Sequence, residues 1–204
     1  MIQRPLPRLI FSVFIVTSTV LTACVPAPLF VAKESMRQVN QLTYLGVDFS
    51  HAGFADPWFT EERLYKRVYK WSEQTMKVEH KYFDFFITSD LKISDRRNEE
   101  IRDSDIRAWP AMLEPFNLTT ETVEAEVRPY LKKGAGVALL IVVEDMVKKY
   151  GIAAHYIVFN RGTGEILLTD QIIEKPRGFI PHIAYLKALR KVARHARKVI
   201  NAHR

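Results

Sequence analysis

The pattern of apolar and polar residues in the first half of the chain predicts short helices and strands that alternate. Residues 29–40 favour a short helix, and residues 41–49 alternate as a strand does before a loop over residues 50–57. A second helix is predicted from Thr60 to about Val78, because Thr60 is followed by two acidic residues and then by apolar residues at helical spacing. The aromatic run at residues 82–88 predicts another strand.

The second half of the chain gives clearer signals. A helix that begins at Thr119 or Thr120 is predicted to run to Leu131. Three apolar segments follow, at residues 136–147, 151–160 and 165–174, and the last two are joined by the turn sequence Asn-Arg-Gly-Thr-Gly. We expect these three segments to form an antiparallel meander.

The last helix is predicted over residues 181–201 and is amphipathic. Its apolar stripe consists of Leu186, Leu189, Val192, Ala193, Ala196, Val199 and Ile200. Its other face is basic and consists of Lys187, Arg190, Lys191, Arg194, Arg197 and Lys198. We call these six residues the basic face; they are a candidate binding surface for anions, and the alternative interpretation is a solvated helix face.

Together these elements predict an α+β fold. The expected architecture is a mostly antiparallel sheet of about five strands, with helices packed on one face and the amphipathic helix at the C-terminus. No repeat, low-complexity tract or long linker divides the chain.

The N-terminus has the pattern of a bacterial lipoprotein signal. Arg4 and Arg8 precede an apolar segment that ends in Leu-Thr-Ala-Cys at residues 21–24. Residues 9–23 are too few to span a bilayer, which takes about 20 apolar residues. Cys24, the only cysteine, is therefore predicted to be the lipidation site, where acyl chains such as palmitate anchor the protein in a membrane. The alternative is an ordinary secretory signal that happens to precede a cysteine.

Cleavage before Cys24 divides the chain into a signal peptide, residues 1–23, and a single domain with a short tether, residues 24–204. The residues from Cys24 onward include 28 Lys or Arg and 23 Asp or Glu, a net charge of +5. Val25, rather than Asp, follows the cysteine, which favours the outer membrane, facing the periplasm. The anions available there are phospholipid headgroups, lipopolysaccharide phosphates and peptidoglycan carboxylates, not nucleic acid.

Several blocks of the sequence resemble a family of small, uncharacterised exported lipoproteins of Bacteroidetes-like bacteria. The blocks lie at residues 45–52, 81–82, 134–137 and 159–167. The resemblance implies a similar fold across most of the domain and no particular chemistry. At the start of the last helix this chain has Pro-His-Ile-Ala-Tyr at residues 181–185, where the family tends to have an aromatic Asn-Tyr-Trp-like run.

The candidate catalytic groups are few. Asp48, Ser50 and His51 lie where a strand meets a loop, but neighbouring residues in a strand point to opposite faces and rarely build a triad. The expected role of Asp48 is to accept hydrogen bonds that close the loop. For the same reason Glu144 and Asp145 are interpreted as solvated hairpin charges. No histidine spacing is typical of a metal site, and the sequence predicts neither a metal nor a cofactor.

The favoured hypothesis is thus a membrane-anchored bacterial lipoprotein without enzymatic activity, whose domain binds an envelope protein or an anionic envelope polymer. The first alternative is an envelope hydrolase that uses the loop from Asp48 to Asp56. A second alternative rests on analogy of fold: the strand-strand-helix tail is loosely similar to lipoprotein cofactors of peptidoglycan synthases.

Overall fold

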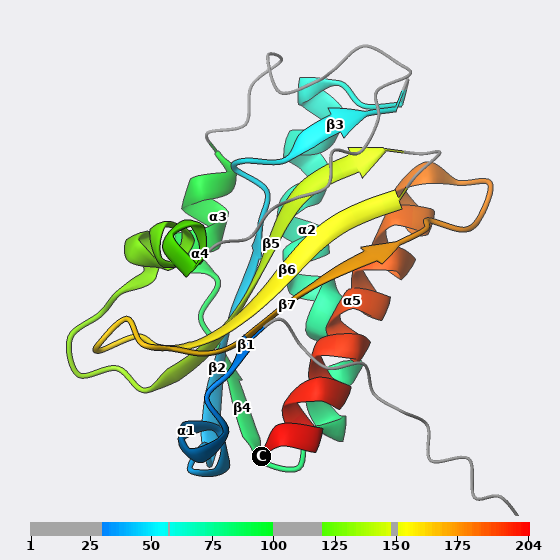
Figure 1. Cartoon of the computed structure of the whole chain (residues 1–204). Coiled ribbons are helices and arrows are strands. Elements are labelled where there is room, and N and C mark those ends of the chain that lie inside the picture. The colour runs from blue at the N-terminus through cyan, green and yellow to red at the C-terminus, as the bar shows by residue number, and fades with distance from the viewer. Residues whose placement is uncertain (1–29, 57, 100–119, 148–150) are drawn as a thin grey trace, which may run out of the picture.

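The computed structural model describes residues 30–56, 58–99, 120–147 and 151–204 of the chain, and Figure 1 shows their arrangement. The elements in chain order are β1 (Phe30–Val31), α1 (Lys33–Arg37), β2 (Gln41–Asp48), β3 (Gly53–Ala55), α2 (Glu61–Met76), η1 (Glu79–Tyr82), β4 (Phe86–Ser89), α3 (Lys92–Asn98), α4 (Thr120–Val127), η3 (Arg128–Tyr130), β5 (Val137–Val147), β6 (Gly151–Asn160), β7 (Ile166–Glu174) and α5 (Pro181–His203).

The strands form one mixed sheet in the order β1-β7-β6-β5-β2-β4, and β3 pairs with β5 outside this path. The pairs β5–β6, β6–β7 and β7–β1 are antiparallel. By contrast, β2 is parallel to both β4 and β5, and β3 is parallel to β5. Helix α2 lies between β2 and β4 in the sequence and supplies the crossover that parallel neighbours need.

The prediction of a mostly antiparallel sheet of about five strands is therefore wrong, because the sheet is mixed and the described residues contribute seven strands to it. The meander of β5, β6 and β7 is confirmed. Periodicity identified β2 and the strand near residue 86, but it carries no information on which strands they join. β3 was missed because three residues are too few to show a period.

Helices lie on both faces of the sheet, which corrects the expectation of one covered face (Figure 1). On one face α2 and α5 bury the larger core, which includes Leu64, Trp71 and Val192. On the other face Val123 and Tyr130, from α4 and η3, pack on residues of β5 and β6. The sheet is thus the middle layer of three, so its central strands are buried on both sides.

The predicted C-terminal amphipathic helix is confirmed as α5. Six of the seven residues of the apolar stripe are buried, and the seventh, Leu186, packs against the larger core. The predicted start of α2 is also confirmed, since the side chain of Thr60 accepts a hydrogen bond from the N–H of Arg63.

Residues 29–40 were wrongly predicted as one helix, because residues 30–31 pair with β7 as β1. Among the described residues, no helix is both long and apolar enough to cross a bilayer.

Candidate functional site

The most distinctive polar site begins at a bulge in β2. The register of β2 against β5 shifts around Gly46, whose φ of +105° lies in the region that favours glycine. Side chains of α2 and α3 complete the backbone hydrogen bonds there. Ser72 Oγ accepts from the N–H of Val47 at 2.9 Å, and Ser94 Oγ donates to the carbonyl of Leu45 at 2.6 Å.

Beyond the bulge, Asp48 is fully buried and its carboxylate accepts four hydrogen bonds. The backbone N–H and hydroxyl of Ser50 donate to Oδ1 at 2.9 and 2.6 Å. Arg97 Nε and Tyr130 Oη donate to Oδ2 at 2.6 and 2.7 Å. Burial disfavours the charged form, but the hydrogen bonds from Ser50 and Tyr130, together with the Arg97 charge, hold the pKa of Asp48 below its ordinary value. The hydrogen bonds of Asp48 therefore tie β2 to α3 and η3, and they favour the charged form of its carboxylate.

Arg97 connects the buried Asp48 with residues at the surface. Its Nη2 donates to Ser50 Oγ at 2.9 Å and lies 2.9 Å from Nε2 of His51. The imidazole of His51 is exposed and lies 3.9 Å from a carboxylate oxygen of Glu126 on α4. The predicted loop-closing role of Asp48 agrees with its bonds to Ser50.

The carboxylate at the far end of the predicted hydrolase loop has different partners. Asp56 is buried and accepts hydrogen bonds from Tyr185 Oη of α5 at 2.7 Å and from the N–H of Trp58 at 2.9 Å. Asp48 is bonded to η3, which lies across the sheet from α5. The two carboxylates of this loop are thus bound to elements on opposite faces of the sheet.

A second polar pair lies on the α4 side of the sheet, and the sequence did not reveal it. Glu144 Oε1 is 2.7 Å from Nε2 of the buried His155. Burial, with a smaller contribution from Glu126, raises the pKa of Glu144 to about 9, and burial lowers that of His155 to about 3. Near neutral pH the pair therefore consists of a carboxylic acid and a neutral imidazole. The interpretation of Glu144 as a solvated hairpin charge is wrong.

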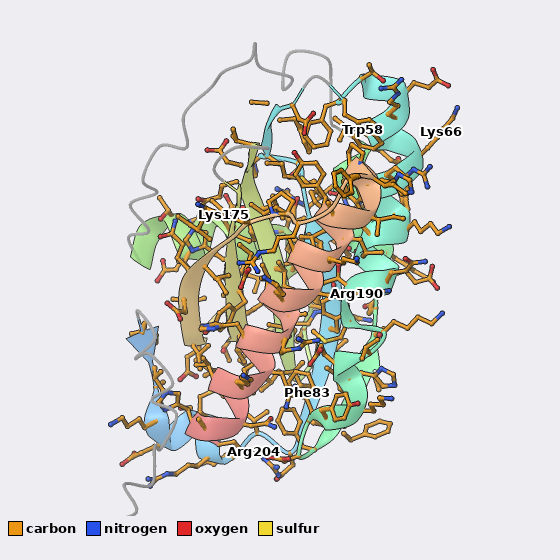
Figure 2. All side chains as sticks on the ribbon, turned by 90° about the vertical axis from the view of Figure 1, so that its right-hand side faces the viewer. Trp58, Lys66, Phe83, Lys175, Arg190 and Arg204 are labelled. Atoms are coloured by element: carbon orange, nitrogen blue, oxygen red, sulfur yellow. The ribbon has the colours of Figure 1, made fainter. Side chains whose placement is uncertain are left out.

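Much of the predicted basic face is engaged in contacts within the protein. Arg194 Nε and Arg197 Nε donate to the buried Glu79 at 3.1 and 2.9 Å. Lys191 Nζ pairs with Glu174 at 2.9 Å. Arg190, labelled in Figure 2, donates through Nε to the carbonyl of Gln74 in α2.

The other two members of the basic face, Lys187 and Lys198, are exposed. Within the described part of the chain neither has an ion-pair partner. The basic face therefore has fewer side chains free to bind an anion than the sequence suggested. Its role in anion binding stays a prediction.

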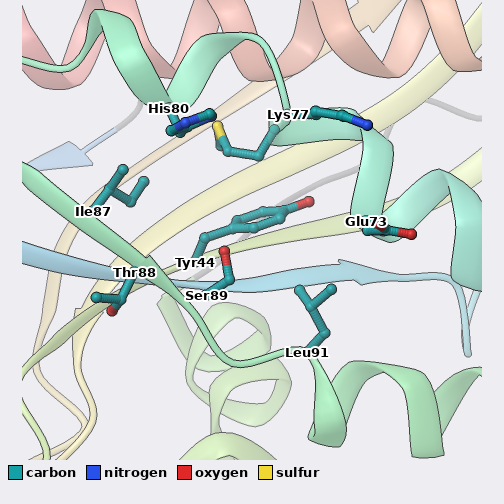
Figure 3. A pocket seen from close by; sticks show the side chains of 9 residues that line it. Tyr44, Glu73, Lys77, His80, Ile87, Thr88, Ser89 and Leu91 are labelled. Carbon is teal, nitrogen blue, oxygen red and sulfur yellow. The ribbon is translucent and has the colours of Figure 1, made fainter.

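A groove of about 310 Å³ lies beside β4 at the end of the sheet (Figure 3). β4 is the last strand on this side and pairs only with β2 among the described residues. The groove is lined by Tyr44, Glu73, Met76, Lys77, His80, Ile87, Thr88, Ser89 and Leu91. Figure 3 shows Ile87, Ser89 and Leu91 across the groove from Glu73, Lys77 and His80.

The groove has an apolar floor and apolar surroundings. The aromatic ring of Tyr44 is almost completely buried and its hydroxyl donates to the carbonyl of Ser72 at 3.1 Å. Val78, Tyr82 and Phe86, in the chain segments next to those that line the groove, are exposed, and Phe86 retains 67% of its surface.

Two remaining predictions concern metals and lipidation. Across residues 30–56, 58–99, 120–147 and 151–204 no group of three or more His, Cys, Asp or Glu side chains is arranged to hold a metal ion. Cys24 and the signal peptide lie outside the described residues, so lipidation stays a prediction.

Comparison with known proteins finds remote structural similarities, and two of them are described here. No protein family and no curated protein sequence matches this chain. The structure of lipoprotein GNA1162 from Neisseria meningitidis is 10% identical, with a TM-score of 0.35, over 78% of this chain and 97% of the other. A PelC dodecamer from Paraburkholderia phytofirmans is 12% identical, with a TM-score of 0.31, over 84% of this chain and 94% of the other. At these scores the similarities carry no inference about function.

Proposed function

We propose that this chain is a lipid-anchored protein of the bacterial cell envelope that acts by binding an extended segment of a partner protein, without catalysis. Cys24 supplies the anchor, and Val25 after it favours the outer membrane with the domain in the periplasm. The observation that carries the binding function is the groove beside β4, a strand that pairs on one side only among the described residues.

The groove suits an extended peptide for two reasons. An edge strand has backbone groups that a further strand can pair with, which supplies affinity without regard to sequence. Ile87, Leu91 and Met76 offer an apolar pocket for one side chain of that peptide, which supplies selectivity. The rim includes Glu73 and Lys77, so the partner needs no strong net charge.

The geometry around Asp48 gives less support to the hydrolase alternative. A general base or nucleophile needs a free lone pair that faces its substrate. The carboxylate of Asp48 is enclosed and already accepts four hydrogen bonds, and Asp56 bonds to Tyr185 on the other face. We therefore assign Asp48 and Arg97 a structural role.

Photo-crosslinking in the native envelope tests the binding site. A photoreactive phenylalanine analogue replaces Phe86 on β4 in one strain and Phe30 on β1 in another. Both are exposed phenylalanines in terminal strands of the sheet, so Phe30 is a matched control. We expect a discrete protein crosslink from position 86 and none from position 30.

The variant Ser89→Trp sharpens this test, because residue 89 is exposed and lines the groove. A bulky ring there fills the pocket without disturbing the core, and it should abolish the crosslink from position 86. Equal crosslinking at positions 86 and 30, or a crosslink that persists in Ser89→Trp, would contradict the proposal.

A further inference from the structure

The connection between β7 and α5 exposes three large apolar side chains. Phe179 is fully exposed, and Ile180 and Ile183 keep 51% and 39% of their surface. We call these three residues the apolar tip. In Figure 1 this connection, drawn in orange, projects at the edge of the molecule beyond the sheet. Single exposed apolar residues are ordinary, but three within five positions of a protruding turn form a patch.

The residues around the apolar tip are cationic. From residue 175 to residue 190 the chain has four basic residues and no acidic one. Three of the four, Lys175, Arg177 and Lys187, are exposed. Glu174, the nearest acidic residue before this stretch, is paired with Lys191.

Two cations of α2 also face the start of α5. Burial lowers the pKa of His182, and the nearby charges of Arg67 and Lys70 lower it further. His182 stacks on Trp58 at a ring-centroid distance of 6.1 Å, so this end of α5 is held against the α2 side of the molecule. The apolar tip is therefore flanked by cationic side chains of α2, of α5 and of the connection between β7 and α5.

An apolar wedge within a cationic frame matches the chemistry of an anionic bilayer. Hydrocarbon accepts the aromatic and aliphatic side chains, while lipid phosphates attract Lys and Arg, each worth about 1 kcal/mol near the surface. A stable protein interface buries about 800 Å² on each partner, more than a convex turn of three residues supplies. Charge and shape thus favour a lipid surface over a protein.

β1 enters the sheet from the side at which β7 ends. Phe30 pairs with Thr169 and Val31 with Leu168, so the chain enters β1 from the side of Gln171 and Glu174. β7 leads into the apolar tip from that same end. The six residues from Cys24 to Phe30 reach at most about 20 Å, comparable with the rise of about 17 Å from Thr169 to Glu174.

We infer that the apolar tip, Phe179, Ile180 and Ile183, inserts into the membrane that holds the Cys24 lipid and so fixes the orientation of the domain. The inference rests on the proposed anchoring of Cys24. It adds a second membrane contact, which prevents the domain from rotating on its tether. The groove beside β4 lies at the opposite end of the strand order from β1 and is then turned toward a partner.

A fluorescent probe on a single thiol tests this inference on the whole acylated protein. Because acylation consumes the thiol of Cys24, the variant Phe179→Cys has one reactive thiol for an environment-sensitive dye. The protein is reconstituted in vesicles of phosphatidylethanolamine and phosphatidylglycerol that contain spin-labelled lipid. The matched control is Phe86→Cys, another exposed phenylalanine at the far edge of the sheet.

We expect blue-shifted emission at position 179 and quenching by the spin-labelled lipid several-fold stronger than at position 86. The triple variant Lys175→Gln, Arg177→Gln, Lys187→Gln should reduce the quenching at position 179 without changing that at position 86. Equal quenching at the two positions would overturn the inference. A blue shift at position 179 that appears only after envelope proteins are added would also overturn it, in favour of a protein partner.

Flotation of the same vesicles separates this inference from the proposed anchor. If neither the unlabelled acylated protein nor the variant Cys24→Ser floats with the lipid, the anchoring proposal fails. If the protein floats and Cys24→Ser does not, but position 179 is unquenched, the anchor stands and the insertion of the apolar tip is wrong.

Discussion

Asp48 and Glu144 carry carboxyl groups on the same side of the sheet, yet at neutral pH the first is charged and the second is neutral. Asp48 is more completely buried, but four donors hold it as an anion. Among the described residues, Glu144 lies 2.7 Å from the neutral imidazole of His155, and burial, with a smaller contribution from Glu126, raises its pKa to about 9. The number of donors that face a buried carboxyl group, more than the depth of burial, decides its charge here.

The raised pKa of Glu144 predicts a pH dependence of folding stability. The folded state keeps a proton that the unfolded chain, with a pKa of 4.5, releases. Stability from this group is therefore complete below pH 4.5 and is lost as the pH rises toward 9. In Glu144→Gln, which keeps the shape but cannot ionise, the decrease in unfolding free energy from pH 5 to pH 8 should be smaller by about 1 to 3 kcal/mol.

Urea unfolding of both proteins at the two pH values measures this difference. The exposed residue Glu124 provides the control, and Glu124→Gln should show the same decrease as the unchanged protein. An identical decrease in Glu144→Gln and in the unchanged protein would show that Glu144 is ionised in the folded state.

Among the elements, α5 is fastened to η1 by a buried acidic residue. Glu79 is 2% exposed and accepts hydrogen bonds from Arg194 and Arg197, one helical turn apart. Arg197 Nη1 and Asn201 Nδ2 also donate to the carbonyl of Tyr82. The basic side chains that the sequence assigns to solvent thus hold a helix whose apolar face already packs on the sheet.

We expect Glu79→Ala to lower the unfolding free energy by about 1 to 3 kcal/mol, because two charge-assisted hydrogen bonds are lost. The loss stays moderate because Arg194 is half-exposed and returns to water. The control is Glu62→Ala, which removes the exposed pair with Lys66 and should leave the unfolding free energy nearly unchanged. Thermal and urea unfolding measure both, and equal losses in the two variants would mean that the Glu79 contacts add nothing.

Across the whole molecule, the C-terminal residue joins segments that are far apart in the sequence. Arg204 Nε donates to the carbonyl of Val39 at 2.8 Å, and Nη1 donates to the carbonyl of Asp84 at 2.8 Å. Its guanidinium also lies over the ring of Phe85, 4.9 Å from the centroid. The end of α5 therefore contacts the residues just before β2 and the residues just before β4.

We expect Arg204→Ala to reduce the unfolding free energy by about 1 to 2 kcal/mol, since two backbone carbonyls lose a charged donor. Lys198→Ala, on the same helix but exposed and without an ion-pair partner in the described chain, should leave stability unchanged within about 0.5 kcal/mol. Chemical denaturation gives both values. A loss in Arg204→Ala no larger than that in Lys198→Ala would show that these contacts do not close the molecule.

The amino-acid sequence by itself determined the type of most elements, because periodicity is a local property. The meander of β5 to β7, the start of α2 at Thr60 and the buried stripe of α5 could all be predicted from it. The prediction of a lipoprotein signal at Cys24 also rests on the sequence alone, because Cys24 lies outside the described residues.

Only the tertiary structure decided which elements are neighbours and what each polar residue does. The insertion of β2 between β5 and β4, the neutral state of Glu144 and the engagement of Arg194 and Arg197 by Glu79 depend on contacts between residues far apart in the chain. A charge pattern shows where cations occur, but burial and partners decide which of them remain free to bind. The same holds for the apolar tip and the groove beside β4, because exposure is a property of the folded surface.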